Sequence, residues 1–264
     1  MKRCGLRTGM QGKTLIVAGL TESTEVFLCK AIEDGVRCIG IQNEDGAIFN
    51  AGGIRTKNLR NHLFENNSLV TYPGADRYEG KGILYEQCDI LVCDGEQSIN
   101  DENVDGISAK IIVEATDFAI TPGADLNLQS KDVVILPDIL VTNGGVIFAF
   151  LTWLRNRNNI HFEFWLRYQK GAYLKILKSI EKSLWRQDID LHIALTQELS
   201  GSLRSFDVET DVIEAEFDGM VEKCVESVFK VMSKHDLGVN FRTGAYVNAI
   251  TNSLRELSFR YFHN

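Results

Sequence analysis

Three things are scarce in this sequence: proline, long apolar runs and clustered positive charge. The 264 residues include three prolines and no low-complexity tract, so the length suffices for one large or two modest globular domains. No apolar run reaches the length of a membrane-spanning helix. The formal net charge is −8 and no long basic run interrupts it. Neither a membrane nor a nucleic acid is therefore an expected partner.

Metal-binding and disulfide patterns are also missing. The six cysteines form no Cys-x-x-Cys pair, and none lies at metal-ligand spacing from one of the five histidines. Cys38, Cys88 and Cys93 fall in or beside apolar, strand-like runs. We therefore expect buried, reduced thiols in an intracellular protein and no metal site. Residues 1–12 are too short and too rich in glycine to predict a signal or transit segment.

Strand and helix patterns alternate between residues 13 and 145. Short apolar runs with β-branched residues predict buried strands at Thr14–Ala18, Val36–Ile41, Asp89–Val92, Lys110–Val113 and Val133–Leu136. Helical or irregular segments lie between them, at Glu22–Glu33, Arg55–Phe64, Gly80–Glu86 and Pro122–Gln129. This alternation predicts an α/β fold with a doubly wound parallel sheet of the Rossmann type.

A Rossmann turn is expected where the first strand meets the first helix. Its working pattern, Gly-x-Gly-x-x-Gly, permits a tight turn, a close approach of the pyrophosphate and close packing of the helix on the strand. Here the three positions hold Gly19, Thr21 and Thr24. Glu22 adds a carboxylate that suits a helix start but repels a bound phosphate. We interpret the two threonines as helix-capping residues rather than as a phosphate clamp.

Helical patterns dominate after Gly144-Gly145. Apolar residues at helical spacing predict helices at Val146–Arg157, Tyr173–Trp185, Val212–His235 and Phe241–Leu257. Gly238 is expected to end the third of these helices. The sequence thus predicts a Rossmann-like dinucleotide-binding domain at residues 1–145 and a helical region at residues 146–264.

Short motifs are spread in a specific order over most of the chain. They include Gly35-Val-Arg-Cys-Ile-Gly40, Asp45-Gly-Ala-Ile-Phe-Asn50, Cys88-Asp-Ile-Leu91, Ala109-Lys-Ile-Ile-Val-Glu114, Thr121-Pro-Gly-Ala-Asp125 and Val134-Ile-Leu-Pro-Asp138. Further along come Gly144-Gly-Val146, Trp153-Leu-Arg-Asn156, Leu237-Gly238 and Arg242-Thr-Gly-Ala-Tyr-Val-Asn-Ala-Ile250. In order and spacing, these motifs resemble the carboxyl-terminal part of an animal-type glutamate dehydrogenase.

The resemblance implies a nicotinamide-binding domain, a helical antenna at about residues 179–207 and a pivot helix at residues 212–235. It also implies NAD or NADP as the cofactor, a hexameric assembly, a mitochondrial location, and the interconversion of glutamate with 2-oxoglutarate and ammonia. A cytoplasmic location is the alternative, since no transit segment is visible. The family's catalytic lysine and carboxylate belong to an amino-terminal domain outside the region of resemblance, so no catalytic residue is expected in this chain.

The resemblance places the cofactor-binding positions at Gly19, Thr21, Asn43 and Asn143. Asn43 replaces the acidic residue that holds the ribose in the family, and it loses the charge-assisted hydrogen bond. Two further positions of the cleft hold Asp117, in place of an amide, and Ala149, in place of a serine. These departures predict that the fold is kept and the chemistry is lost.

Three functional hypotheses follow. In the first, the chain is a glutamate dehydrogenase relative that is inactive alone and binds a nucleotide weakly. In the second, it is an assembly or regulatory partner that forms homo- or hetero-oligomers with glutamate dehydrogenase-type subunits. An exposed apolar surface would favour this second hypothesis. In the third, the sequence is a piece of a longer, active enzyme.

Overall fold

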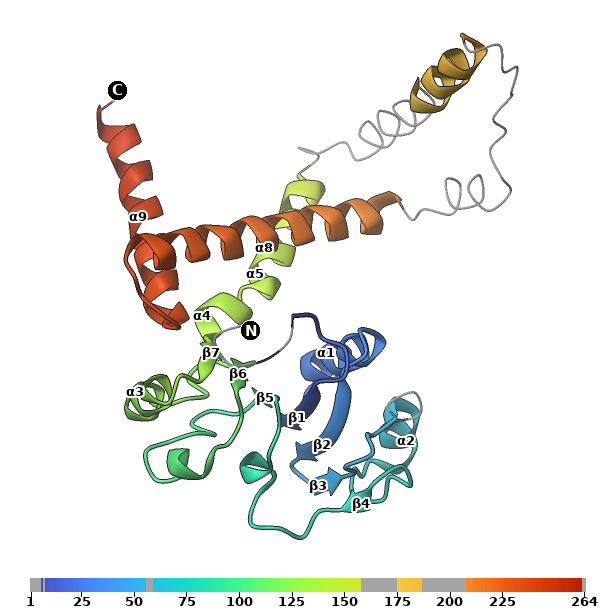
Figure 1. The fold of residues 1–264 in the computed structure, drawn as a ribbon, viewed down its shortest axis with the longest axis vertical. Helices are drawn as coiled ribbons and strands as arrows, with labels where there is room; N and C mark the ends of the chain where they lie inside the picture. The colour runs from blue at the N-terminus through green and yellow to red at the C-terminus, as the bar shows by residue number, and fades with distance from the viewer. Residues whose placement is uncertain (1–5, 7, 56–58, 158–174, 187–207, 263–264) are drawn as a thin grey trace. The chain divides into compact units, whose positions relative to one another are not determined.

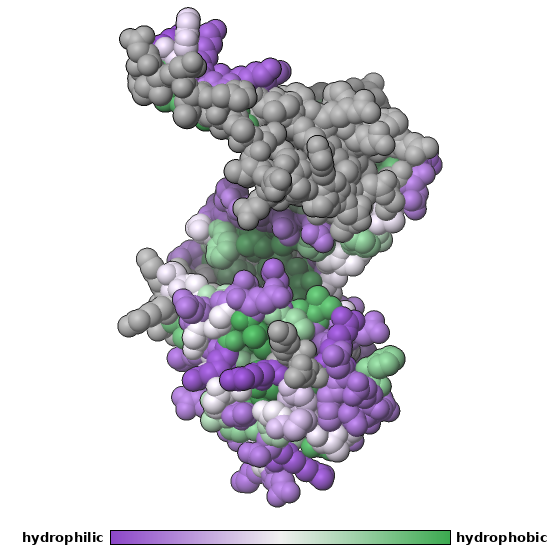
Figure 2. Space-filling model, turned by 90° about the vertical axis from the view of Figure 1, so that its right-hand side faces the viewer, coloured by the Kyte–Doolittle hydropathy of each residue, from purple (hydrophilic) through white to green (hydrophobic). Residues whose placement is uncertain are grey.

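The structure is a computed structural model that describes residues 6, 8–55, 59–157, 175–186 and 208–262. Its contacts divide the chain into two units. One unit combines residues 1–143 with residues 225–264, and the other consists of residues 144–224. The first unit contains the β-sheet, whose strands are labelled in the lower part of Figure 1. In Figure 2 the lower part of the visible surface is mostly hydrophilic, with scattered hydrophobic residues.

The sheet has seven strands in the order β4-β3-β2-β1-β5-β6-β7. The strands β2, β1, β5, β6 and β7 pair in parallel, which confirms the predicted doubly wound parallel sheet. The strand bounds are Thr14–Ala18 (β1), Arg37–Asn43 (β2), Gly46–Phe49 (β3), Asp76–Arg77 (β4), Ile90–Cys93 (β5), Ile111–Glu114 (β6) and Val134–Leu136 (β7). All five predicted strands are present, each within one or two residues of its predicted ends.

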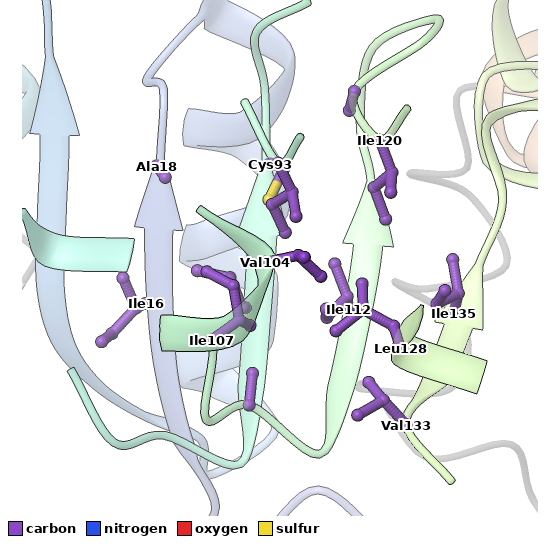
Figure 3. Packing of buried hydrophobic residues seen from close by; sticks show 14 of the residues in the cluster. Ile16, Ala18, Cys93, Val104, Ile107, Ile112, Ile120, Leu128, Val133 and Ile135 are labelled. Atoms are coloured by element: carbon purple, nitrogen blue, oxygen red, sulfur yellow. The ribbon is translucent and has the colours of Figure 1, made fainter. Parts of the chain in front are cut away.

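Both faces of the sheet are buried, because alternate residues of each strand point to opposite sides. In β1, Ile16 and Ala18 pack in one apolar cluster, and Leu15 and Val17 pack in a second. Figure 3 shows the first cluster, in which Leu128 lies against the strands. This alternation explains why the strands read as continuous apolar runs in the sequence.

The sequence did not predict the antiparallel edge formed by β3 and β4. A tight turn joins β2 to β3, and the Asn43 side-chain oxygen accepts hydrogen bonds from the amides of Asp45 (3.0 Å) and Gly46 (3.2 Å). The Asp45 carboxylate in turn accepts from the Ser68 hydroxyl at 2.7 Å, and this bond helps to hold the pKa of Asp45 below its usual value. Both strands are short, and Ile48 is the one fully buried residue of β3, so no apolar run marked them.

The helices agree with the predicted pattern, with shifts at their ends, except for the short α4, which the sequence did not predict. Their bounds are Glu22–Glu33 (α1), Leu59–Asn66 (α2), Pro122–Ser130 (α3), Asp138–Val141 (α4), Gly144–Asn156 (α5), Val208–Lys234 (α8) and Phe241–Phe262 (α9). Short 3-10 turns lie at Ile83–Tyr85 and Val104–Gly106. Residues 175–185 are helical as well. Within the predicted antenna, residues 187–207 lie outside the described residues.

The end of α8 and the start of α9 pack against each other. The turn between them contains Gly238 with a positive φ of 62°, a conformation that favours glycine. Val228 and Met232 of α8 form a small buried cluster with Ala245 of α9. The predicted glycine stop is wrong in position, because α8 ends at Lys234 and the left-handed residue after it is Asp236, with a φ of 50°. The Leu237 amide closes this helix end on the Met232 carbonyl at 3.0 Å. Gly238 lies in the following turn, which leads the chain into α9.

The predicted burial of the strand cysteines is also confirmed. Cys38, Cys88 and Cys93 are buried and unpaired. Burial raises the pKa of Cys38 and of Cys88 to about 12, although a hydrogen bond from Cys38 to Gly40 opposes the shift. These thiols are therefore poor nucleophiles at neutral pH. Among the described helices, none combines the length and apolar character that a membrane span requires.

Candidate functional site

A crevice of about 570 Å³ opens at the carboxyl ends of β1, β2 and β5. From β1 the sheet order runs to β2 on one side and to β5 on the other. In doubly wound folds, this switch point is where ligands bind. The residues lining the crevice include Gly19, Thr21, Gln42, Asn43, Glu44, Asp94 and Ser98.

Gly19 makes the sharp turn from β1 toward α1. Its φ is 101°, and a Cβ atom added there would overlap the backbone carbonyl of Asp94. The Gly19 amide donates to the Gln42 carbonyl at 3.1 Å, while the Asp94 amide donates to the Ala18 carbonyl at 2.8 Å. The first glycine of the Rossmann pattern is therefore required by the path of the backbone.

Thr21 and Thr24 form a capping box at the start of α1. The Thr21 amide donates to the Thr24 hydroxyl oxygen at 2.8 Å, and the Thr24 amide lies 3.5 Å from the Thr21 hydroxyl oxygen. Thr24 is 3% exposed. The interpretation of these threonines as caps is confirmed. Amides that a phosphate would need are thus already bonded to side chains within the turn.

Asp94 follows β5 and contacts the same turn. Its Oδ2 atom accepts from the Thr21 hydroxyl at 2.5 Å and from the Thr24 hydroxyl at 3.0 Å. The sequence patterns did not indicate this residue. The signal that could have found it is an acidic residue directly after a buried strand, beside the switch point of the sheet.

The side chains around the crevice carry negative charge. Glu44 and Asp94 are among the lining residues, and no lysine, arginine or histidine is found among those that the structure describes. Glu22 lies exposed in the first turn of α1. A dinucleotide presents a doubly charged pyrophosphate at this point, so the residues of this turn do not fit the phosphates of NAD or NADP.

The remaining predicted cofactor-binding residues differ in their placement. Asn43 lines the crevice, but its side-chain oxygen is used by the β2–β3 turn described above. Asn143 follows α4, where its side-chain amide donates to the Ile139 carbonyl, and it is not a lining residue of the crevice. The structure thus brings Gly19, Thr21 and Asn43 together and places Asn143 elsewhere.

A second polar cluster centres on Arg242, near the start of α9. Its guanidinium donates to Asp125 at 3.0 Å, to Asp138 at 2.9 Å and to Glu114. Glu114 is fully buried at the end of β6 and also accepts from the amides of Ile120 and Asp138, each at 3.0 Å. The motifs found in the sequence contain these residues, but their positions in the sequence did not indicate that their side chains contact one another.

The Arg242 cluster fastens α9 to the sheet. Burial raises the pKa of Glu114 above its ordinary value, although the nearby Arg242 cation opposes that shift. Burial by itself would lower the pKa of Arg242, but the carboxylates of Glu114 and Asp125 outweigh that effect and raise it above its ordinary value. A shared cation compensates these carboxylates, and the cluster therefore has a structural role.

The chain can now be compared with known proteins. Residues 1–187 match the family described as Glutamate/Leucine/Phenylalanine/Valine dehydrogenase. The mitochondrial glutamate dehydrogenase of Dictyostelium discoideum is 29% identical over 258 residues, which cover 95% of this chain and 49% of that protein.

Solved structures share the fold. The hetero-hexameric glutamate dehydrogenase of Thermus thermophilus superposes with a TM-score of 0.66 at 17% identity, over 94% of this chain and 47% of that one. The glutamate dehydrogenase of Peptoniphilus asaccharolyticus gives a TM-score of 0.65 at 18% identity, over 99% and 50% of the two chains. The chain thus spans about half the length of the relatives it matches.

Proposed function

This chain belongs to the Glutamate/Leucine/Phenylalanine/Valine dehydrogenase family, and from that premise we propose that it is a glutamate dehydrogenase relative whose crevice no longer holds NAD or NADP productively. Residues 1–145 correspond in this proposal to the nicotinamide-binding domain, and α8 to the pivot helix. By itself the chain does not interconvert glutamate and 2-oxoglutarate, because hydride transfer needs a bound nicotinamide. The proposed compartment is the mitochondrion, since the Dictyostelium relative is mitochondrial.

The capping box of Thr21 and Thr24 is the observation that carries this proposal. A dinucleotide-binding turn leaves its backbone amides free for the pyrophosphate and keeps its second and third positions small. In this chain the amides of both threonines face hydroxyl oxygens of the same pair. The side chains also add bulk where glycine would let the cofactor and the helix approach.

The proposal predicts that the purified chain binds NADH only weakly, with a dissociation constant above about 1 mM. Titration with NADH, followed by energy transfer from tryptophan to the nicotinamide, measures this directly. A variant carrying Thr21→Gly, Glu22→Asn and Thr24→Gly should bind NADH about tenfold more tightly, a gain of about 1.4 kcal/mol. The substitutions free the backbone amides of the turn and remove one acidic side chain.

The matched control is Ser23→Gly, which places a glycine in the same helical turn without touching the capping box. It should leave NADH binding unchanged. Saturable micromolar binding by the unmodified chain would sink the proposal, and tests of activity with a supplied substrate domain would then follow.

A second candidate function is that of an assembly partner, and the surface of α9 favours it. Tyr246, Ile250, Leu254 and Leu257 are 50%, 58%, 60% and 49% exposed. Their spacing places them on one side of the helix. An apolar stripe of this kind points to a protein partner. We propose a glutamate dehydrogenase-type subunit as that partner, because the Thermus relative forms a hetero-hexamer.

This candidate predicts a mixed oligomer when the chain is combined with a full-length glutamate dehydrogenase subunit. Leu254→Asp should abolish the mixed oligomer, because it places a charge in the apolar stripe. Asn252→Asp adds the same charge on the opposite side of α9 and should leave assembly intact. Native mass spectrometry distinguishes mixed oligomers from self-association, and the absence of any mixed species would reject the candidate.

A further inference from the structure

We infer that Asp94 is the specificity residue that excludes phosphate from the crevice. Its carboxylate acts as a built-in anion at the start of α1, in the place where a dinucleotide would put its pyrophosphate. This inference rests on the proposed function, and it assigns the exclusion to one residue outside the glycine pattern.

Hydrogen bonding supports the assignment. The Thr21 and Thr24 hydroxyls lie 2.5 Å and 3.0 Å from one oxygen of Asp94. A hydroxyl has a single proton to donate. Each proton that is given to Asp94 is therefore withheld from a ligand, and short hydrogen bonds to a carboxylate are strong ones.

The negative charge of Asp94 also supports its assignment as the residue that excludes phosphate. Asp94 lies at the positive end of the α1 dipole, where a negative group is stabilised. A bound phosphate would have to share that position with the carboxylate at close range, and like charges repel. Among the described residues that line the crevice there is no basic side chain, so none of them compensates the repulsion.

The position of Asp94 is fixed by the sheet. Ala18 of β1 pairs with Cys93 of β5 in parallel register, so the residue after each strand emerges beside the other. The Asp94 amide is bonded to the Ala18 carbonyl at 2.8 Å. The backbone pairing therefore places the Asp94 side chain directly beside the turn at the start of α1.

The inference predicts that the phosphate, and not the nucleoside, is what Asp94 rejects. ADP and adenosine are the probes, because they share a base and ribose and differ in the diphosphate. Asp94→Ala should raise the affinity for ADP at least tenfold and change the affinity for adenosine less than twofold. Asp94→Asn, which removes the charge and keeps the shape, should give a smaller gain for ADP.

Calorimetric titration of the full chain measures both ligands, and thermal unfolding checks that each variant folds. Glu96→Gln is the matched control, since it neutralises an exposed acid two residues away and should leave both affinities unchanged. An ADP affinity of Asp94→Ala within twofold of the unmodified chain, or an equal gain for adenosine, would overturn the inference. The NADH titration of the unmodified chain tests the proposed function separately.

Discussion

Replacing Arg242 with methionine is expected to lower the free energy of unfolding by about 3–5 kcal/mol, because a buried ion cluster loses the cation that its three carboxylates share. Arg242 holds Glu114, Asp125 and Asp138 through three different nitrogens. Methionine keeps an apolar stem of similar length, so the loss reports the charge rather than a cavity. Urea denaturation of both proteins at neutral pH measures the difference.

The destabilisation by Arg242→Met should shrink as the pH falls from neutral toward about 5. Burial already raises the pKa of Glu114 in the folded protein, against the pull of Arg242, and removing the cation raises it further. A group whose pKa is raised on folding supports stability below its unfolded pKa and loses that support as the pH rises through its folded pKa. Protonated Glu114 no longer places an uncompensated charge in the interior.

Two further variants test whether uncompensated buried charge causes the loss of stability. Adding Glu114→Gln to Arg242→Met should recover part of the lost stability at neutral pH, since the buried charge is gone. Arg242→Lys keeps a cation but lacks the planar guanidinium that can bond three carboxylates. Its stability should therefore lie between that of the unmodified protein and that of Arg242→Met. Asp89, whose pKa is lowered, destabilises all the variants alike at acid pH and cancels in the comparison. A loss below about 1 kcal/mol for Arg242→Met would contradict the assigned role.

Gly19→Ala is expected to cost about 3 kcal/mol of folding free energy, through backbone strain and steric overlap. The φ of 101° disfavours any residue with a Cβ atom, and the added carbon would overlap the Asp94 carbonyl. Relief requires β1 and β5 to move apart at the point where they pair. Thermal and urea unfolding measure the cost.

Gly219→Ala in α8 is the matched control. A Cβ atom added at Gly219 meets nothing within 4 Å, and alanine inside a helix should stabilise by about 0.5–1 kcal/mol relative to glycine. The two alanine substitutions should therefore have opposite signs. Equal effects would show that the geometry of the turn at Gly19 does not limit the fold.

Together these results would separate the scaffold from the binding site. Gly19 and Arg242 are predicted to matter for folding, whereas the threonine cap and Asp94 are predicted to matter for ligand selection. The turn thus has glycine where its backbone needs it, and it holds threonine at the two positions where glycine would let the cofactor and the helix approach. Such a division is expected when a fold is retained while the site on it changes.

The sequence predicted the strands of the sheet that consist of short, continuous apolar runs. The β1 and β5 strands are buried on both faces, and a continuous run of apolar residues is the direct consequence. The sequence did not predict β3 and β4, because short strands with few buried side chains leave no periodic signal. The capping role of Thr21 and Thr24 was predictable, since a cap depends on residues three apart.

Local patterning in the sequence therefore determined most of the helices, the central strands, and the turn after β1 that holds threonine at two glycine positions. Only the tertiary structure decided which polar and charged side chains contact each other. Asp94 bonds to Thr21 across 73 positions of the chain, and Arg242 bonds to Glu114 across 128. Neither pairing follows from the spacing of the residues in the sequence. The first exists because the sheet order places β5 beside β1, and the second because the start of α9 lies at the end of β6.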